Sequence, residues 1–211
     1  MIIHNVLNQL FSSPAAVSIL RELSLRAKGA TGRELARASG ITHQAAHNTL
    51  SKLEQLNIIN REHLGNAHYF IINRKHFLTK YIVESIFKSE QKYSALLFDK
   101  IKNTIGSYSV SVILFGSVAR CEETVESDLD ICIIYSSNKK YLEDTISELR
   151  EDLYIQFGVT LAPYYITKTD FIKKYKLNKT PVSEIVKEGK LISGTPINRI
   201  IHGKKSTPQK V

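Results

Sequence analysis

Residues 107–135 read SYSVSVILFGSVARCEETVESDLDICIIY, and this stretch organises the rest of the chain. Two apolar, β-rich runs, residues 110–115 and 129–135, predict strands on either side of a sharp turn and a short helix. Gly116 lets the backbone turn tightly and lets a ligand come close. Ser117 follows at the start of the short helix, where free N–H groups favour phosphate. The stretch therefore predicts an anion site at the end of a strand.

Two aspartates, Asp128 and Asp130, stand where the second strand begins. Residues two apart on a strand point to the same face, so we expect the two carboxylates to project together. Carboxylate oxygens are hard ligands, which Mg²⁺ prefers. A metal site beside an anion site suits a nucleoside triphosphate with its metal.

The pattern of Gly116-Ser117, ten residues and Asp128-x-Asp130 resembles the signature of minimal nucleotidyltransferases of the DNA polymerase beta superfamily. Ala119-Arg120 and Ser127 also match, and TPVSEIVKEGKLISG, residues 180–194, resembles the closing helix and strand of these domains. Thr180-Pro181 predicts the start of that helix, with a capping hydroxyl and Pro in the first turn. The resemblance covers roughly the second half of the chain.

The resemblance implies roles for five of these residues. Asp128 and Asp130 would be the catalytic residues and would hold Mg²⁺ (or Mn²⁺), with a nucleoside triphosphate as ligand or substrate. Gly116 and Ser117 would seat the triphosphate. Arg120 could reach a phosphate oxygen, and it could equally pair with a neighbouring acid, Glu122 or Glu123.

The chain departs from the family pattern at two places. Cys121 stands where the family usually has Gly after Ala-Arg. Catalytic members generally add a third carboxylate from a later strand, but the best later strand, VTLAPYYIT at 159–167, contains no acid. The nearest acids are Glu148, Glu151 and Asp152 on the expected preceding helix and Asp170 after the strand. Two aspartates alone support nucleotide binding better than turnover.

Cap residues divide the first part of the chain into three short helices. The expected boundaries are Ser13-Pro14, Lys28-Gly29, a capping box of Thr31 with Glu34, a left-handed cap at Gly40, a cap at Thr42 and an end near Gln55. Two short helices joined by a Gly-containing turn predict a helix-turn-helix. Residues 58–62 and 68–73 then predict a β-hairpin, which would be a wing.

The third helix offers a polar outer face opposite Ala46, Leu50 and Leu53. Residues 10–75 resemble the winged-helix domains of bacterial and archaeal transcription regulators, above all in ARASGITHQAAHNTLSKLEQLNIINRE at 36–62. The resemblance implies double-stranded DNA as a partner; protein contact is the alternative use of such a domain. The residues expected to contact DNA are Thr42, His43, Gln44, His47, Asn48, Lys52, Arg61 and Arg74.

Charge and composition agree with a protein that binds nucleic acid. The 211 residues carry a net charge of +9. Residues 1–78 hold nine Lys and Arg against four acids, or +5, and the rest holds 20 against 16, or +4, so the smaller part is the more basic per residue. Two cysteines, Cys121 and Cys132, give no disulfide framework, and no run is long enough to span a membrane, so we expect a cytoplasmic protein.

The expected fold is α+β or α/β, with a winged helix-turn-helix at 1–78, a helical connector at 79–106, a nucleotidyltransferase fold with a small mixed sheet at 107–202 and a disordered tail at 203–211. Pro163 predicts that the strand at 159–167 lies at an edge or ends there. Helical periodicity over 77–105 predicts one long helix, or two broken near Ser89. Its apolar face would pack on the sheet or on a second copy, as a homodimer.

Two functions remain open at this level. One is a Mg²⁺-dependent nucleotidyltransferase that carries a DNA-binding winged helix and acts on an unknown acceptor. A protein acceptor is one option, since related small members act as antitoxins that nucleotidylate a toxin. The other is a DNA-binding transcriptional regulator whose nucleotidyltransferase-like domain senses a nucleotide without turning it over.

Overall fold

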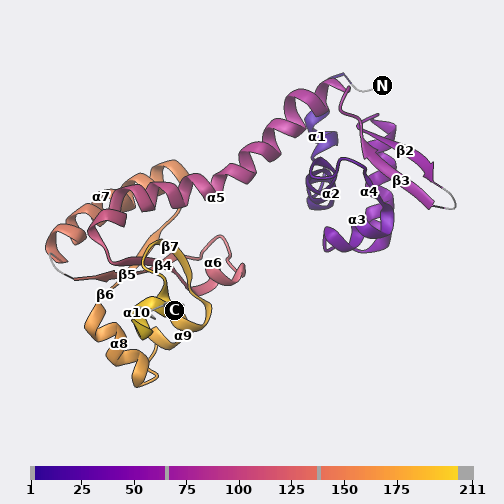
Figure 1. Cartoon of the computed structure of the whole chain (residues 1–211). Helices are drawn as coiled ribbons and strands as arrows, with labels where there is room; N and C mark the ends of the chain where they lie inside the picture. Colours follow the sequence, from indigo (N-terminus) through magenta and orange to yellow (C-terminus); the bar gives the residue numbers. More distant parts are fainter. Residues whose placement is uncertain (1–2, 65–66, 137–138, 204–211) are drawn as a thin grey trace, which may run out of the picture. The chain divides into compact units, whose positions relative to one another are not determined.

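The computed structural model describes residues 3–64, 67–136 and 139–203, and the chain divides into two compact units between Tyr93 and Ser94 (Figure 1). Within the described residues, the first unit holds four α-helices, a three-stranded sheet, a π-helical turn and the start of a long helix. Its elements are α1 (Val6–Leu10), α2 (Pro14–Ser24), β1 (Ala30–Thr31), α3 (Gly32–Ala38), α4 (His43–Gln55), β2 (Ile59–Leu64), β3 (Ala67–Ile72), η1 (Thr79–Val83) and α5 (Glu84–Ile105), which runs on into the second unit.

Three of the predicted caps are confirmed. Ser13, Thr31 and Thr42 each accept a hydrogen bond from a backbone N–H in the first turn of α2, α3 and α4. At α3 the capping box is complete, because the Glu34 carboxylate accepts the Thr31 N–H at 2.8 Å. Gly40 follows α3 with φ +64, as a left-handed cap requires. These caps fix where the helices of the helix-turn-helix begin.

The predicted end of the first helix at Lys28-Gly29 is wrong, because α2 ends at Ser24. Gly29 has another use: it has φ +71, and a Cβ atom there would collide with the backbone carbonyl of Phe70. The chain thus leaves the helix early and brings β1 against β3, with Ala30 opposite Phe70. The glycine permits a close approach between two strands and does not cap a helix.

The predicted wing is confirmed as a hairpin of β2 and β3, in a sheet of order β1-β3-β2. Residues 65–66 of its expected loop lie outside the described residues. Beneath the sheet, the three inner residues predicted for α4 are confirmed as buried, in one core with the other helices. This core holds Leu20, Leu23, Leu35, Ala46, Leu50, Leu53, Ile59, Phe70, Val83 and Phe87, among others.

The connector is a single helix across the predicted break near Ser89, since α5 is continuous from Glu84 to Ile105 after the π-helical turn η1. Some of its apolar positions pack within the chain: Phe87 lies in the core of the first unit, and Ile101 and Ile105 lie in that of the second. Ile86, Tyr93 and Leu96 are exposed. The predicted packing of this face on the sheet is therefore confirmed for the C-terminal part of α5. The homodimer stays a prediction.

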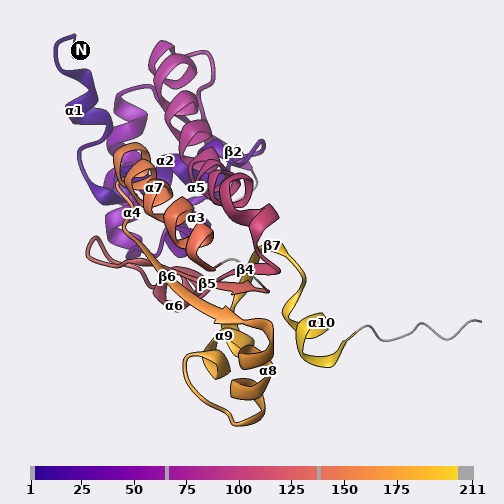
Figure 2. The ribbon, with the colours of Figure 1, turned by 90° about the vertical axis from the view of Figure 1, so that its left-hand side faces the viewer.

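The second unit is a four-stranded mixed sheet covered by helices on both faces (Figure 2). Its elements after α5 are η2 (Gly106–Tyr108), β4 (Ser111–Leu114), α6 (Gly116–Arg120), β5 (Leu129–Tyr135), α7 (Lys139–Phe157), β6 (Leu161–Thr167), α8 (Lys168–Lys176), α9 (Val182–Glu188), β7 (Lys190–Gly194) and α10 (Ile197–His202). The order is β6-β5-β4-β7; β5 and β6 are parallel, and the other pairs are antiparallel. Pro163 lies in β6, which is an edge strand as predicted.

Alternation along the central strands separates the two helical layers. Val112 and Leu114 of β4 pack with α5 and α7, whereas Ile113 packs with α8, α9 and α10 on the opposite face. Ile131 and Cys132 of β5 divide in the same way. The sheet is thus buried on both sides, and its functional groups must lie at the strand ends.

One predicted helix start needs correction. Thr180 does not cap α9: Pro181 occupies the N-cap position, and its carbonyl accepts the N–H of Ile185 at 2.9 Å. Thr180 therefore lies one residue too early to reach the free N–H groups of the first turn. The predicted tail lies outside the described residues except for Gly203. No helix in the described ranges is long and apolar enough to cross a membrane.

We predict that Cys121→Gly raises the free energy of unfolding in urea by about 1 kcal/mol. Cys121 has φ +59, where a residue with a side chain is strained by roughly 1–2 kcal/mol and glycine is not. Asn178→Gly is the matched control, since Asn178 has φ +49 in the same unit and asparagine tolerates that region. Equal stability changes in the two variants would contradict the assignment of strain to Cys121.

Candidate functional site

The turn after β4 is closed by direct contact between Gly116 and Asp130. Gly116 begins α6 with φ +74, and a Cβ atom there would overlap the Asp130 carboxylate. The Phe115 N–H also donates to the Asp130 carbonyl oxygen at 3.0 Å. Only glycine satisfies both the backbone angle and this contact. The structure therefore brings the predicted turn and the second predicted aspartate together.

Asp128 lies one position before β5, and its charge acts on Asp130. Asp128 is exposed, while Asp130 is half-buried. Burial raises the pKa of Asp130, the negative charge of Asp128 raises it further, and Arg120 opposes both. The Thr124 N–H donates to the Ser127 hydroxyl at 2.9 Å, in a tight turn that leads into Asp128. The two carboxylates thus form a concentrated negative site beside Gly116.

Arg120 points its guanidinium at two carboxylates of the chain itself. Its Nε donates to Glu122 at 2.7 Å, and a terminal nitrogen donates to Glu188 of α9. Both hydrogen bonds raise the pKa of Arg120, and the bond to Glu122 has the larger effect. The expected pairing with Glu122 is confirmed, and Glu188 was missed because it lies 68 residues further along the chain. Arg120 must leave these partners before it can bind a phosphate.

The strand register locates the position of the absent third carboxylate. Ala162 lies beside Asp130 across the parallel pair β5–β6, and the Thr160 carbonyl accepts the Leu129 N–H at 2.8 Å. Since positions two apart share a face, Thr160 and Ala162 are the residues of this edge on the side of Asp130.

The nearest acids lie elsewhere, as the sequence predicted. Asp152 of α7 pairs with Lys100 at 2.7 Å, and Asp170 accepts the Thr167 hydroxyl at the start of α8. Within the described ranges, no three His, Cys, Asp or Glu side chains are grouped as a metal site would need. The candidate site thus contains two carboxylates.

The six residues predicted to contact DNA from α4 and its N-cap are all exposed. His43, Gln44, His47 and Asn48 are exposed, and the Gln44 amide donates to Asn48 at 3.0 Å. Thr42 and Lys52, at its two ends, are exposed as well. The whole set of helix residues named from the sequence is therefore accessible to a partner.

The two predicted arginines are exposed but ion-paired. Arg61 of β2 pairs with Glu54 of α4, and Arg74 pairs with Glu84 at 2.6 Å. Both pairs lie at the surface with Glu54 and Glu84 partly buried, and ion pairs of this kind are worth little in water. A phosphate can therefore compete for either guanidinium.

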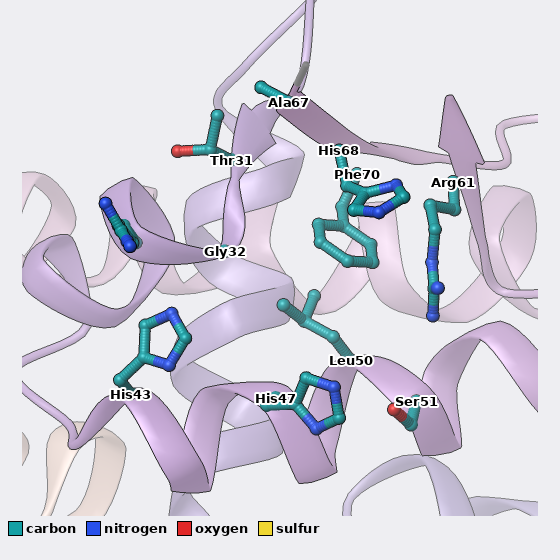
Figure 3. Close-up of a pocket in the computed structure, with 11 residues that line it drawn as sticks. Thr31, Gly32, His43, His47, Leu50, Ser51, Arg61, Ala67, His68 and Phe70 are labelled. Atoms are coloured by element: carbon teal, nitrogen blue, oxygen red, sulfur yellow. The ribbon is translucent and has the colours of Figure 1, made fainter. Parts of the chain in front are cut away.

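A groove of about 640 Å³ separates α4 from the wing (Figure 3). Leu50 and Phe70 lie in its floor, and His47, Arg61 and His68 project around it. Arg33 and His68 were not predicted as site residues. The hairpin register brings His68 opposite His63, and the helix-turn-helix brings Arg33 to the groove. The alternation of the hairpin could have identified His68, whereas nothing local indicates Arg33.

Comparison with known proteins identifies both parts of the chain. The model of the family described as Polymerase beta, Nucleotidyltransferase matches residues 99–196, and that of the MarR family matches residues 13–67. No curated protein matches significantly. A solved structure described as a toxin-antitoxin with AMP-PNP has 17% identity and a TM-score of 0.34, covering 46% of this chain and 73% of its own. The chain therefore joins an N-terminal winged helix that matches the MarR family model to a C-terminal nucleotidyltransferase domain that matches the polymerase beta model.

Proposed function

We propose that this protein is a cytoplasmic DNA-binding regulator whose nucleotidyltransferase domain binds a nucleoside triphosphate together with Mg²⁺ or Mn²⁺. The observation that carries the proposal is the packing of the Asp130 carboxylate on Gly116, with Asp128 beside it. This arrangement supplies two hard oxygen ligands at one strand end, beside a tight turn that only glycine permits.

The charges of the site fit a divalent cation. Burial raises the pKa of Asp130, and repulsion from Asp128 raises it further. A cation between the two carboxylates would lower the free-energy cost of keeping both ionised. Asp128 and Asp130 would hold the metal, which when bound would neutralise charge on the triphosphate. Gly116 and Ser117 would lie against the phosphates. Arg120 would exchange its contacts with Glu122 and Glu188 for a phosphate oxygen.

Binding without turnover is favoured by the residues at the edge of β6. Nucleotidyl transfer needs an acceptor oxygen to attack the α-phosphorus while pyrophosphate leaves, and a base must take the acceptor proton. Thr160 and Ala162 cannot take that proton, while Asp152 of α7 pairs with Lys100 and Asp170 of α8 accepts the Thr167 hydroxyl. The domain therefore suits a nucleotide sensor.

Nucleotidyl transfer to an unknown acceptor, including a protein, is the second candidate, and one observation favours it. Both aspartates and the Gly116 turn keep the arrangement that a metal–triphosphate requires, although burial and mutual repulsion make Asp130 costly to the fold. An acceptor that brings its own base would complete the reaction. The winged helix then serves to place the enzyme on DNA.

DNA binding is assigned to the outer face of α4 and to the wing. Exposed His47 and Asn48 are short and polar, as groups that read base edges in a major groove are. Arg61 and Arg74 would contact phosphates in place of their exposed carboxylate partners. The groove between α4 and the wing lies within this same surface.

We predict that Asp130→Asn abolishes the thermal stabilisation given by Mg²⁺ with a nucleoside triphosphate, yet makes the metal-free protein more stable near pH 7. A carboxyl whose folded pKa is raised stabilises below its unfolded pKa and loses that contribution as pH rises through its folded pKa. The gain from asparagine should therefore vanish below about pH 3, where the carboxyl is neutral in both states.

Urea unfolding in EDTA between acidic and neutral pH measures this difference. Asp144→Asn, on the exposed side of α7, is the matched control and should alter neither stability nor ligand response. An Asp130→Asn variant that is less stable than the wild type at pH 7 would contradict the arrangement of the two carboxylates.

We predict that Thr160→Asp tightens Mn²⁺ binding by at least about tenfold, because it adds a third carboxylate on the edge that faces Asp130. Titration of Mn²⁺ by electron paramagnetic resonance gives the affinity, and transfer of labelled α-phosphate tests whether turnover rises as well. Thr160→Asn, which has the same size without the charge, should leave the affinity unchanged. Equal affinities of the Asp and Asn variants would disprove the register argument.

We predict that His47→Ala with Asn48→Ala lowers affinity for a duplex selected by the wild type from a random library by about tenfold or more, since each good base contact is worth about 1–3 kcal/mol. Nucleotide affinity should not change. Asn198→Ala with His202→Ala, exposed residues of the same types on α10, is the control. A parallel loss of DNA and nucleotide affinity would refute this division between the two domains.

A further inference from the structure

The positive charge of the nucleotidyltransferase domain is confined to its last helical layer. Residues 79–167 hold nine Lys and Arg against thirteen acids, a net charge of −4. Residues 168–203 hold eight against three, a net charge of +5. These residues form α8, α9, β7 and α10, and the three helices cover one face of the sheet (Figure 2). One side of the domain is therefore strongly cationic.

Six of the seven lysines of residues 168–203 are exposed, and Lys174, the seventh, is partly buried and donates to the Tyr164 hydroxyl. In the part of the chain that the structure describes, no ion pair joins a carboxylate to any of Lys168, Lys173, Lys176, Lys179, Lys187 and Lys190. On the opposite face, Lys100 and Lys139 pair with Asp152 and Glu143. The cationic layer thus presents charge that the fold does not neutralise.

Helix stability does not account for these positions. The negative C-terminal end of α8 favours Lys173 and Lys176, which lie in its last turn. Lys168, however, begins the helix, where a cation is unfavourable, and Lys179 lies beyond its end. The cluster therefore exceeds what the helix dipole explains.

The layer exposes two large apolar side chains, Leu177 and Leu191, which is less than the broad apolar face that a membrane-bound helix uses. The inner side of α8 is buried within the domain, since Phe171 is fully buried against Val182 and Ile185 of α9. A helix that lies on a membrane needs a large exposed apolar face beside its lysines. Exposed lysines around a polar surface suit the phosphates of a nucleic acid, where binding releases counterions.

We infer that the α8 face, defined by Lys168, Lys173, Lys176 and Lys179, binds the phosphodiester backbone of a nucleic acid, as a surface separate from the winged helix. Lysines contact phosphates without reading bases, so this surface tolerates many sequences. Single-stranded RNA and single-stranded DNA share the chemistry it recognises. A single-stranded ligand also distinguishes this surface from α4, to which we assign the binding of double-stranded DNA.

The full-length protein tests this with a triple variant, Lys173→Gln, Lys176→Gln and Lys179→Gln. The matched control is Lys92→Gln, Lys102→Gln and Lys140→Gln, exposed residues of α5 and α7 that give the same change in net charge. Fluorescence anisotropy measures affinity for RNA and DNA single strands of one sequence, about 20 nucleotides long, between about 50 and 200 mM NaCl.

The α8 variant should lose about tenfold or more in affinity at the lowest salt, and its slope of log affinity against log salt should fall by about 2, or 0.7 for each lost phosphate contact. The control should change by less than about threefold. If affinity is lost for RNA alone, for DNA alone or for both, the result shows which of the two nucleic acids the surface binds. Lys→Arg replacements at the same three positions should retain binding, which separates lost charge from a damaged fold.

Three results would overturn the inference. Equal losses in the α8 variant and the control would mean that only net charge matters. Unchanged affinity in the α8 variant would place the contact elsewhere. Absence of oligonucleotide binding by the wild type, with binding to phosphatidylserine-containing vesicles, would make the layer a membrane surface.

Discussion

The contact between Gly116 and the Asp130 carboxylate is the constraint on which the nucleotidyltransferase site depends. It joins the end of β4 to the start of β5, and it exists because the glycine has no side chain and adopts φ +74. The same contact half-buries a carboxylate next to Asp128, which is costly without a cation. The fold thus holds two negative groups in a position that ligand binding would relieve.

The layers of the second unit connect this site to the cationic face of the domain. Arg120 of α6 pairs with Glu188 of α9, and α9 packs on α8 through Val182 and Phe171. The candidate site and the cationic layer therefore share α9.

Local patterns in the sequence predicted most of the fold. Thr31 and Thr42 form caps, and the apolar, β-rich run of 129–135 gives β5, because each depends on neighbours within a few residues. The predicted helix end at Lys28-Gly29 was wrong for a tertiary reason, and the predicted helix start at Thr180 was wrong for a local one. Gly29 is required for contact with β3, and Pro181 itself takes the cap position of α9.

The candidate site was predictable only in part, for the same reason. Spacing placed Gly116, Asp128 and Asp130 together because they flank two adjacent strands. The pairing of Arg120 with Glu188 depends on a tertiary contact that no local pattern encodes. The same is true of the position of Arg33 in the groove beside α4. The register that places Ala162 beside Asp130 likewise depends on how β6 pairs with β5.

The most direct test of the central claim is calorimetric titration of the wild-type protein with each of the four nucleoside triphosphates, with and without Mg²⁺. The account predicts saturable binding of at least one triphosphate that disappears when Mg²⁺ is removed, because Asp128 and Asp130 repel the bare phosphates. Binding that is equally tight without a divalent cation, or no binding of any of the four, would contradict it.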